Sequence, residues 1–192
     1  FLLKKTSASD GWGVYHHKNT SAPATEYLRL DSTAATSDNL GEWNDTAPTS
    51  TVFTIGNSGR TNDNGVTYIA YCFAEKKGYS KFGSYTGNGN ANGTFVYTGF
   101  KPAWVMTKSS SSAGQSWHIQ DNKRDGFNYD NKRLFADSNS SESGTTRMDL
   151  LSNGFKYRDG DGNGTGITYI YIAFAEEPLV ANVGASIPAT AR

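Results

Sequence analysis

The chain has 192 residues, of which 18 are basic and 18 acidic, so its formal net charge is zero. This balance excludes a global electrostatic attraction to nucleic acid or to an acidic membrane surface. The sequence predicts neither a transmembrane helix nor a signal peptide. Abundant Gly, Ser, Thr and Asn, together with 13% aromatic residues, favour many short strands joined by turns.

The first strong strand pattern in chain order is TYIAYCFAE, residues 67–75. Ile69, Tyr71 and Phe73 alternate onto one face, and Tyr68 and Cys72 lie on the other. Both faces are apolar, which predicts a central strand covered on both sides. Within such a strand the single cysteine, Cys72, is expected to be a small core residue.

The next expected strands are residues 95–97 and 104–106, separated by Gly99 and Pro102. Residues 149–151 and 155–157 predict a hairpin whose Asn153-Gly154 turn uses positive φ angles. Similar turns are expected at Asn-Gly pairs 64–65, 88–89, 92–93 and 163–164. TYIYIAFAE, residues 168–176, is the last expected strand, and no amphipathic helix is predicted.

The two nonamers are copies of each other, with six of nine positions identical. Other features recur in the same order: residues 1–5 parallel 104–108, Trp12 parallels Trp117, and residues 29–30 parallel 133–134. A period of roughly 100 residues is that of an independent domain. We therefore predict an all-β fold of tandem β-sandwich domains of the jelly-roll, concanavalin-like or SPRY-like kind. Residues 1–78 form the first copy, and residues 79–192 form the second copy with a C-terminal tail.

The second copy is introduced by two segments, residues 83–87 and 93–103, that have no equivalent before Phe1. The first copy is thus expected to lack its N-terminal strands. They belong either to an upstream part of a longer chain or to another subunit. Because an unpaired sheet edge is a template for association, we expect a partner there.

Four segments resemble a repeated domain of tailed-phage virion proteins of the marine phage type: FGSYTGNG (82–89), FVYTGFKPAWV (95–105), LSNGFK (151–156) and TYIYIAFAE (168–176). The ending IPATAR (187–192) looks like the natural C-terminus of such chains. The resemblance implies a tail fibre or other virion structural protein, located in the extracellular particle. It implies a partner in the virion, but no particular receptor.

Sugar binding is the main chemical possibility, because an aromatic face can stack on a pyranose ring while polar groups hold its hydroxyls. The candidate residues recur in both copies: Trp12, Tyr15 and His16, then Trp117, His118, Asp121 and Asn122. Packing within the fold is the competing interpretation for both tryptophans. A host-surface glycan is the expected ligand.

Asp159, Asp161 and Asn163 place oxygen ligands at alternate positions, as at the start of a calcium loop. The bidentate Glu expected later in such a loop is missing, and a polar turn explains the pattern equally well. Calcium is thus the one cofactor considered. The three histidines are too few and too separate for a zinc site.

No enzymatic activity is expected. The acidic residues Asp121, Asp125, Asp130, Asp137 and Glu142 do not alternate along a strand as a paired acid and base would. No nucleophile elbow, P-loop or dinucleotide fingerprint is present.

The leading hypothesis is a phage tail fibre or appendage subunit that contributes to host-surface attachment, assembled from copies of itself or with other virion proteins. One alternative is a capsid or tail decoration or scaffold protein that binds only virion proteins. Another alternative is an extracellular glycan-degrading enzyme.

Overall fold

A computed structural model of the chain describes residues 1–125, 128 and 130–177. The fold is all-β and of the sandwich type, with antiparallel sheets, as predicted. The elements in chain order are β1 (Leu2–Lys5), β2 (Trp12–Val14), β3 (Glu26–Arg29), β4 (Ser37–Asp38), α1 (Leu40–Trp43), α2 (Gly59–Asn62), β5 (Tyr68–Tyr71), β6 (Ser80–Thr86), β7 (Phe95–Tyr97), β8 (Trp104–Ser109), β9 (His118–Asp121), β10 (Asp130–Phe135), β11 (Ser143–Leu151), β12 (Gly154–Tyr157) and β13 (Thr168–Phe174). The ending 187–192 lies outside the described residues.

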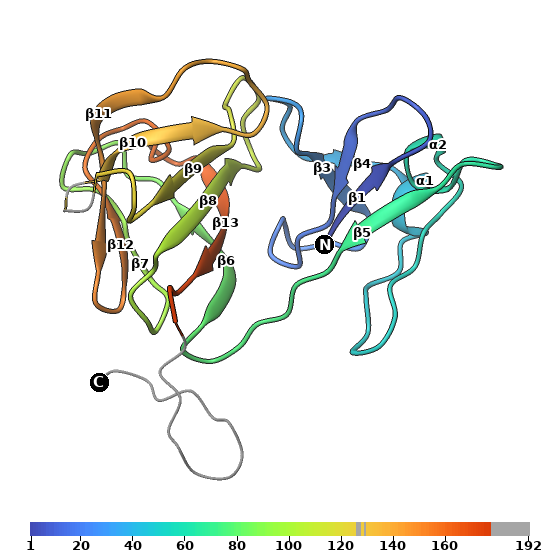
Figure 1. The fold of residues 1–192 in the computed structure, drawn as a ribbon, viewed down its shortest axis with the longest axis horizontal. Coiled ribbons are helices and arrows are strands. Elements are labelled where there is room, and N and C mark those ends of the chain that lie inside the picture. The colour runs from blue at the N-terminus through green and yellow to red at the C-terminus, as the bar shows by residue number, and fades with distance from the viewer. Residues whose placement is uncertain (126–127, 129, 178–192) are drawn as a thin grey trace, which may run out of the picture.

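The strands form two antiparallel sheets that stand beside each other (Figure 1). The first has the order β4-β3-β2-β1-β5, and all its strands lie within residues 1–78. The second has the order β6-β13-β8-β9-β10-β11-β12-β7, and all its strands lie within residues 79–192. The order β5-β1-β2-β3-β4 of the first sheet therefore matches β13-β8-β9-β10-β11 of the second, which supports the predicted duplication.

The strand register corrects two of the sequence pairings. Leu2 pairs with Tyr71, and Met106 pairs with Ile172, so Leu2 corresponds to Met106 rather than to Val105. Arg29 pairs with Gly13, and Phe135 pairs with His118. With Trp12 matched to Trp117, Arg29 corresponds to Phe135, and its predicted match with Arg133 was wrong. The arginine in the second copy sits two residues earlier along the strand.

The prediction of a central, doubly covered strand is correct for β13 and wrong for β5. Ile170, Ile172 and Tyr171 are buried, because β6 and β8 flank β13. β5 instead lies at the end of its sheet, where Ile69 is 40% exposed and Tyr71 43% exposed. Cys72 is exposed for the same reason and is not a core residue. The two nonamers differ in environment because, among the described residues, only β13 has a strand on both sides.

The predicted hairpin is present as β11 and β12, with Leu151 paired to Gly154. Its two turn residues are Ser152 and Asn153, and neither Asn153 nor Gly154 has a positive φ angle. Positive φ angles do occur in the predicted turns at Gly65 (71°) and Gly89 (68°). Two single-turn helices, α1 and α2, were not predicted, because four residues are too short for an amphipathic pattern.

The core contains three clusters. One lies within the second sheet around Phe155, Tyr157 and Tyr169, and a small one lies within the first sheet around Trp43. The remaining cluster joins the two sheets and consists of Val14, Leu28, Phe82, Met106, Trp117, Ile170 and Ile172. We call it the shared cluster. Because it takes residues from both predicted copies, the two sheets are packed against each other through an apolar core.

Candidate functional site

The two tryptophans predicted to bind sugar occupy matching backbone positions. The amide of Trp12 donates to Asp31 Oδ1 at 3.0 Å, and the amide of Trp117 donates to Asp137 Oδ1 at 2.7 Å. Their carbonyls accept hydrogen bonds from Leu30 and Ala136, each at 3.4 Å. An aspartate one strand away thus fixes the start of β2 and of β9 in the same manner.

Their side chains have different roles. Trp117 is fully buried, and its indole N–H donates to Arg29 O at 2.7 Å, across to the other sheet. Its ring is therefore part of the shared cluster and is inaccessible to a sugar in this structure. Trp12 is half-buried, stacked on Tyr71 with ring centroids 5.9 Å apart, and has the Lys4 ammonium 5.9 Å above its ring.

Tyr15 and His16 line a cleft of about 490 Å³ where the two sheets meet. Its apolar side chains include Phe1 and Phe53, whose ring centroids are 4.4 Å apart, and Phe73 and Phe82, 6.4 Å apart. Polar groups are contributed by His16, His17, Glu75 and residues 49–51. An apolar floor with a few polar groups is typical of a small-molecule site.

The charges at the cleft are set by burial. His16 is buried, its Nε2–H donates to Tyr171 O at 3.1 Å, and its Nδ1 accepts from Lys18 N at 3.1 Å. Desolvation lowers its pKa to about 3, so the ring is neutral. Desolvation also lowers the pKa of the exposed His17, while the Glu75 carboxylate opposes that shift. Glu75 Oε1 accepts from Phe82 N at 3.1 Å, which holds this carboxylate at the cleft.

The matching residues of the second copy do not form a comparable cleft. His118 is buried, with Arg133 Nη1 at 3.3 Å from its Nδ1, and burial together with this guanidinium lowers its pKa to about 4. Asp121 accepts hydrogen bonds from the amides of Lys123 and Arg124 and forms an ion pair with Arg124 at 2.7 Å. Asn122 donates to Glu176 Oε2 at 3.1 Å. The structure therefore does not gather the predicted second set into one site, although Asp121 and Asn122 line a shallow hollow beside Trp104.

The predicted calcium ligands are engaged by protein groups. Asp159 forms an ion pair with Arg147 at 2.5 Å, and Asp161 forms one with Arg133 at 2.5 Å. Asn163 is fully buried and donates to Asn88 Oδ1 at 2.8 Å. These contacts tie the loop to two strands and to the segment after β6, as expected of a structural turn.

The carboxylates considered for hydrolysis are dispersed as well. Asp137 holds the Trp117 amide, and Asp125 accepts from Lys132 N at 3.0 Å. Asp130 is 2% exposed, and neither of its carboxylate oxygens has a hydrogen-bond partner within the part of the chain that the structure describes. Burial, with the nearby Asp125 and Asp121 charges, raises its pKa to about 7. Asp130 is therefore only partly ionised near neutral pH, and it does not line the cleft at Tyr15 and His16.

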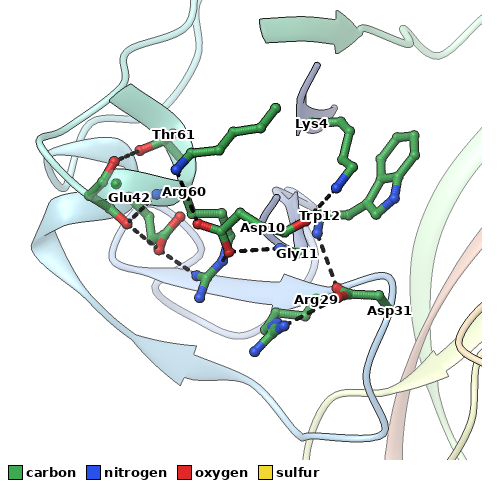
Figure 2. A network of polar contacts seen from close by, with 12 residues as sticks. Lys4, Asp10, Gly11, Trp12, Arg29, Asp31, Glu42, Arg60 and Thr61 are labelled. Atoms are coloured by element: carbon green, nitrogen blue, oxygen red, sulfur yellow. Dashed lines mark hydrogen bonds and ion pairs between the residues drawn. The ribbon is translucent and has the colours of Figure 1, made fainter. Parts of the chain in front are cut away.

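A polar network on the first sheet was not found from the sequence (Figure 2). Glu42 in α1 is fully buried, and its Oε1 accepts from Arg60 Nη1 at 2.6 Å and from Ser58 Oγ at 3.0 Å. Arg60 also lies over the Tyr27 ring, 4.9 Å from its centroid, and 3.9 Å from Asp10 Oδ1. The residues of this network come from segments far apart in the chain, so no spacing in the sequence predicts the network. The network joins α1, α2 and the β1–β2 turn.

Within the described ranges, no group of three or more His, Cys, Asp or Glu residues has the arrangement that a metal ion requires. None of the helices among the described residues has the length and apolar character needed to cross a membrane.

No curated protein and no solved structure matches the chain. One family model does match, over residues 1–178, and it carries the description "Domain of unknown function (DUF7483)". The match spans both sheets and the cleft between them. The chain therefore belongs to the DUF7483 family.

Proposed function

We propose that the chain is a non-enzymatic β-sandwich module of a phage virion, and that it contributes to host-surface attachment by binding a glycan in the cleft between its sheets. The cleft is the observation that carries the proposal. It combines exposed aromatic surface at Phe73, which is 47% exposed, with the polar groups of His17 and Glu75. A pyranose ring presents both an apolar face and hydroxyl groups, which suits such a lining.

The contacts and protonation of the ionisable side chains support ligand binding rather than catalysis. Of the acids named from the sequence, Asp121 is ion-paired with Arg124, Asp125 and Asp137 accept from backbone amides, and Asp130 is buried. The fifth, Glu142, is exposed and does not line the cleft. His16 at the cleft is neutral and hydrogen-bonded on both ring nitrogens. The virion location is supported by the sequence resemblance alone.

Glycan-array screening of the labelled protein, followed by calorimetric titration of the best ligand, tests the binding. We expect Phe73→Ala to weaken the binding at least tenfold, because it removes an exposed ring from the cleft. Phe95→Ala is the matched control: Phe95 is 45% exposed on β7 and does not line the cleft. We expect that variant to bind as the parent does.

Two results would contradict the proposal. Equal loss of affinity in both variants would place the glycan elsewhere. Release of reducing sugar from host polysaccharide by the purified protein would show an enzyme.

A further inference from the structure

A further hollow, which we call the basic hollow, lies between the segment that joins the two sheets and the end of β7. Its volume is about 380 Å³. Residues 75–78, 80 and 81 form one wall, and residues 97–99 form the other. β6 and β7 are the outermost strands of the second sheet, so the hollow lies where the two ends of that sheet approach each other. A volume of this size falls within the range of small-molecule sites.

Strand geometry places Lys81 at the basic hollow. Side chains alternate between the two faces of β6. Phe82 enters the shared cluster, and Tyr85 enters the core of the second sheet. Lys81 therefore lies on the same face as Tyr85, near the start of the strand, where it lines the hollow.

A tight turn presents two more lysines, Lys76 and Lys77. The amides of Tyr79 and Ser80 both donate to Lys76 O at 2.9 Å. Lys76 N donates to Ser80 Oγ, also at 2.9 Å. Gly78 supplies the positive φ angle, 76°, that this turn requires. These bonds fix the backbone from which both lysine side chains extend.

The positive charge of the three lysines is not neutralised within the described part of the chain. The lysine ion pairs found there belong to Lys5, Lys123 and Lys132. Glu75 is the one acidic residue of the lining, and its Oε1 accepts from Phe82 N at 3.1 Å. The hollow therefore has an excess of positive charge, although the chain as a whole is neutral.

Tyr97 adds an aromatic ring and a hydroxyl group to the opposite wall. Tyr97 is 61% exposed, and its hydroxyl oxygen lies 3.6 Å from the position that a Cβ on Gly99 would occupy. No hydrogen bond to another described residue engages this hydroxyl. Thr98 offers no free donor, because its Oγ1 donates to Phe100 O at 2.6 Å. The groups available to a ligand are thus the ammonium groups, the phenol and one aromatic face.

We propose that the basic hollow binds an acidic sugar, whose carboxylate accepts hydrogen bonds from Lys76, Lys77, Lys81 and the Tyr97 hydroxyl. Like charges in one hollow repel each other, and a carboxylate among them replaces this repulsion by charge-assisted hydrogen bonds. The exposed Tyr97 ring suits the apolar face of a pyranose. Nucleic acids and membranes are contacted over broad basic surfaces, whereas these donors surround a hollow.

The inference goes beyond the proposed function and does not rest on it. Glu75 lines both the cleft and the basic hollow, so the two adjoin. The three lysines and Tyr97 do not line the cleft. An acidic sugar can therefore bind in the hollow whether or not the cleft binds a glycan.

Calorimetric titration of the full chain with trigalacturonate, and with its methyl ester, tests the proposal. The ester has the same sugar units without their charges, and we expect it to bind at least tenfold more weakly. The affinity for the acid should fall as salt is added, because salt screens exposed charges.

The double variant Lys77→Gln with Lys81→Gln should bind the acid at least tenfold more weakly. Lys101→Gln with Lys123→Gln is the matched control, since it changes the net charge equally at exposed positions outside the hollow. We expect the control to bind as the parent does. Tyr97→Phe keeps the ring and should weaken the binding at least threefold, through loss of the hydroxyl. Circular dichroism checks that the variants are folded.

Phe73→Ala separates this inference from the proposed function, because Phe73 lines the cleft and not the hollow. We expect Phe73→Ala to bind trigalacturonate as the parent does. If it lowers the affinity while the Lys77 and Lys81 double variant does not, the acid lies in the cleft. The inference then fails and the proposed function stands.

The inference also fails if the acid and its ester bind equally, or if the control variant loses as much affinity as the lysine double variant. Phosphatidylserine vesicles and duplex DNA are tested beside the sugar. Tighter binding of either one, lost in the lysine double variant, would assign the hollow to a membrane or to nucleic acid instead.

Discussion

Single residues in this fold show how the surroundings set the role of a side chain. Trp12 and Trp117 have the same backbone contacts, yet only Trp117 is sealed into the shared cluster and hydrogen-bonded to the other sheet. The equivalent lysines behave alike: Lys4 Nζ donates to Asp10 O, and Lys108 Nζ donates to Gln115 O. Lys108 is buried, and desolvation lowers its pKa to about 8.

His16 should make the stability depend on pH. Its pKa falls from the unfolded value of 6.5 to about 3 in the fold, so the unfolded chain binds an extra proton between these values. The contribution of neutral His16 to the free energy of unfolding is fully present above pH 6.5, and it is lost as the pH falls toward 3. At pH 5 the loss relative to pH 7 is about 2 kcal/mol.

We expect His16→Gln to remove this part of the slope, because glutamine does not titrate. Urea unfolding of both proteins at pH 5, 6 and 7 measures it. A parallel decline in the parent and the variant would show that His16 is not the group responsible.

At the scale of elements, the single-turn helices are held in place by side chains. Asn39 and Ser58 cap α1 and α2 by accepting from Gly41 N and Arg60 N. The buried ion pair of Glu42 and Arg60 then joins the two helices, with the Nη1–Oε1 distance at 2.6 Å. Helices of four residues are not stable by themselves, so these contacts determine where they form.

Arg60→Met should destabilise the fold by about 3–5 kcal/mol at pH 8, because the fully buried Glu42 carboxylate loses its cation. Burial already raises the pKa of Glu42, and Arg60 opposes that rise. Without Arg60 the pKa rises further, so the variant should lose less stability at pH 5, where Glu42 can take up a proton.

The double variant Arg60→Met with Glu42→Gln should recover part of the loss, since no buried charge remains. Denaturant unfolding at the two pH values measures all three proteins. A single variant that is equally destabilised at pH 5 and pH 8 would contradict the assigned role of Glu42.

At the scale of the whole molecule, the shared cluster couples the two sheets. Val14 and Leu28 from the first sheet pack with Trp117 and Ile170 from the second. Although each sheet also has a cluster of its own, a substitution in the shared cluster removes contacts from both sheets.

We therefore expect one cooperative thermal transition for the full chain, with calorimetric and van't Hoff enthalpies in agreement. Leu28→Ala, at a position 1% exposed, should lower the stability of that single transition by about 2–5 kcal/mol. Scanning calorimetry with aromatic circular dichroism measures it. Two separate transitions, only one of them shifted by the variant, would show that the sheets unfold independently.

Part of this architecture follows from the sequence alone. Alternating apolar residues and Asn-Gly turns predicted the strands of both nonamers, the β11–β12 hairpin and the all-β class, because side-chain direction in a strand has a period of two. The repeated nonamer and the recurring tryptophans likewise predicted that the two halves of the chain are related.

The tertiary structure decided the rest. Similar nonamers became an exposed edge strand and a buried central strand, because burial depends on which other strand arrives beside them. The tertiary structure also brought Tyr15 and His16 into a cleft with residues 49–53 and 72–75. It paired Glu42 with Arg60 as well. Such contacts join residues far apart in the chain, and no local pattern of residue types encodes them.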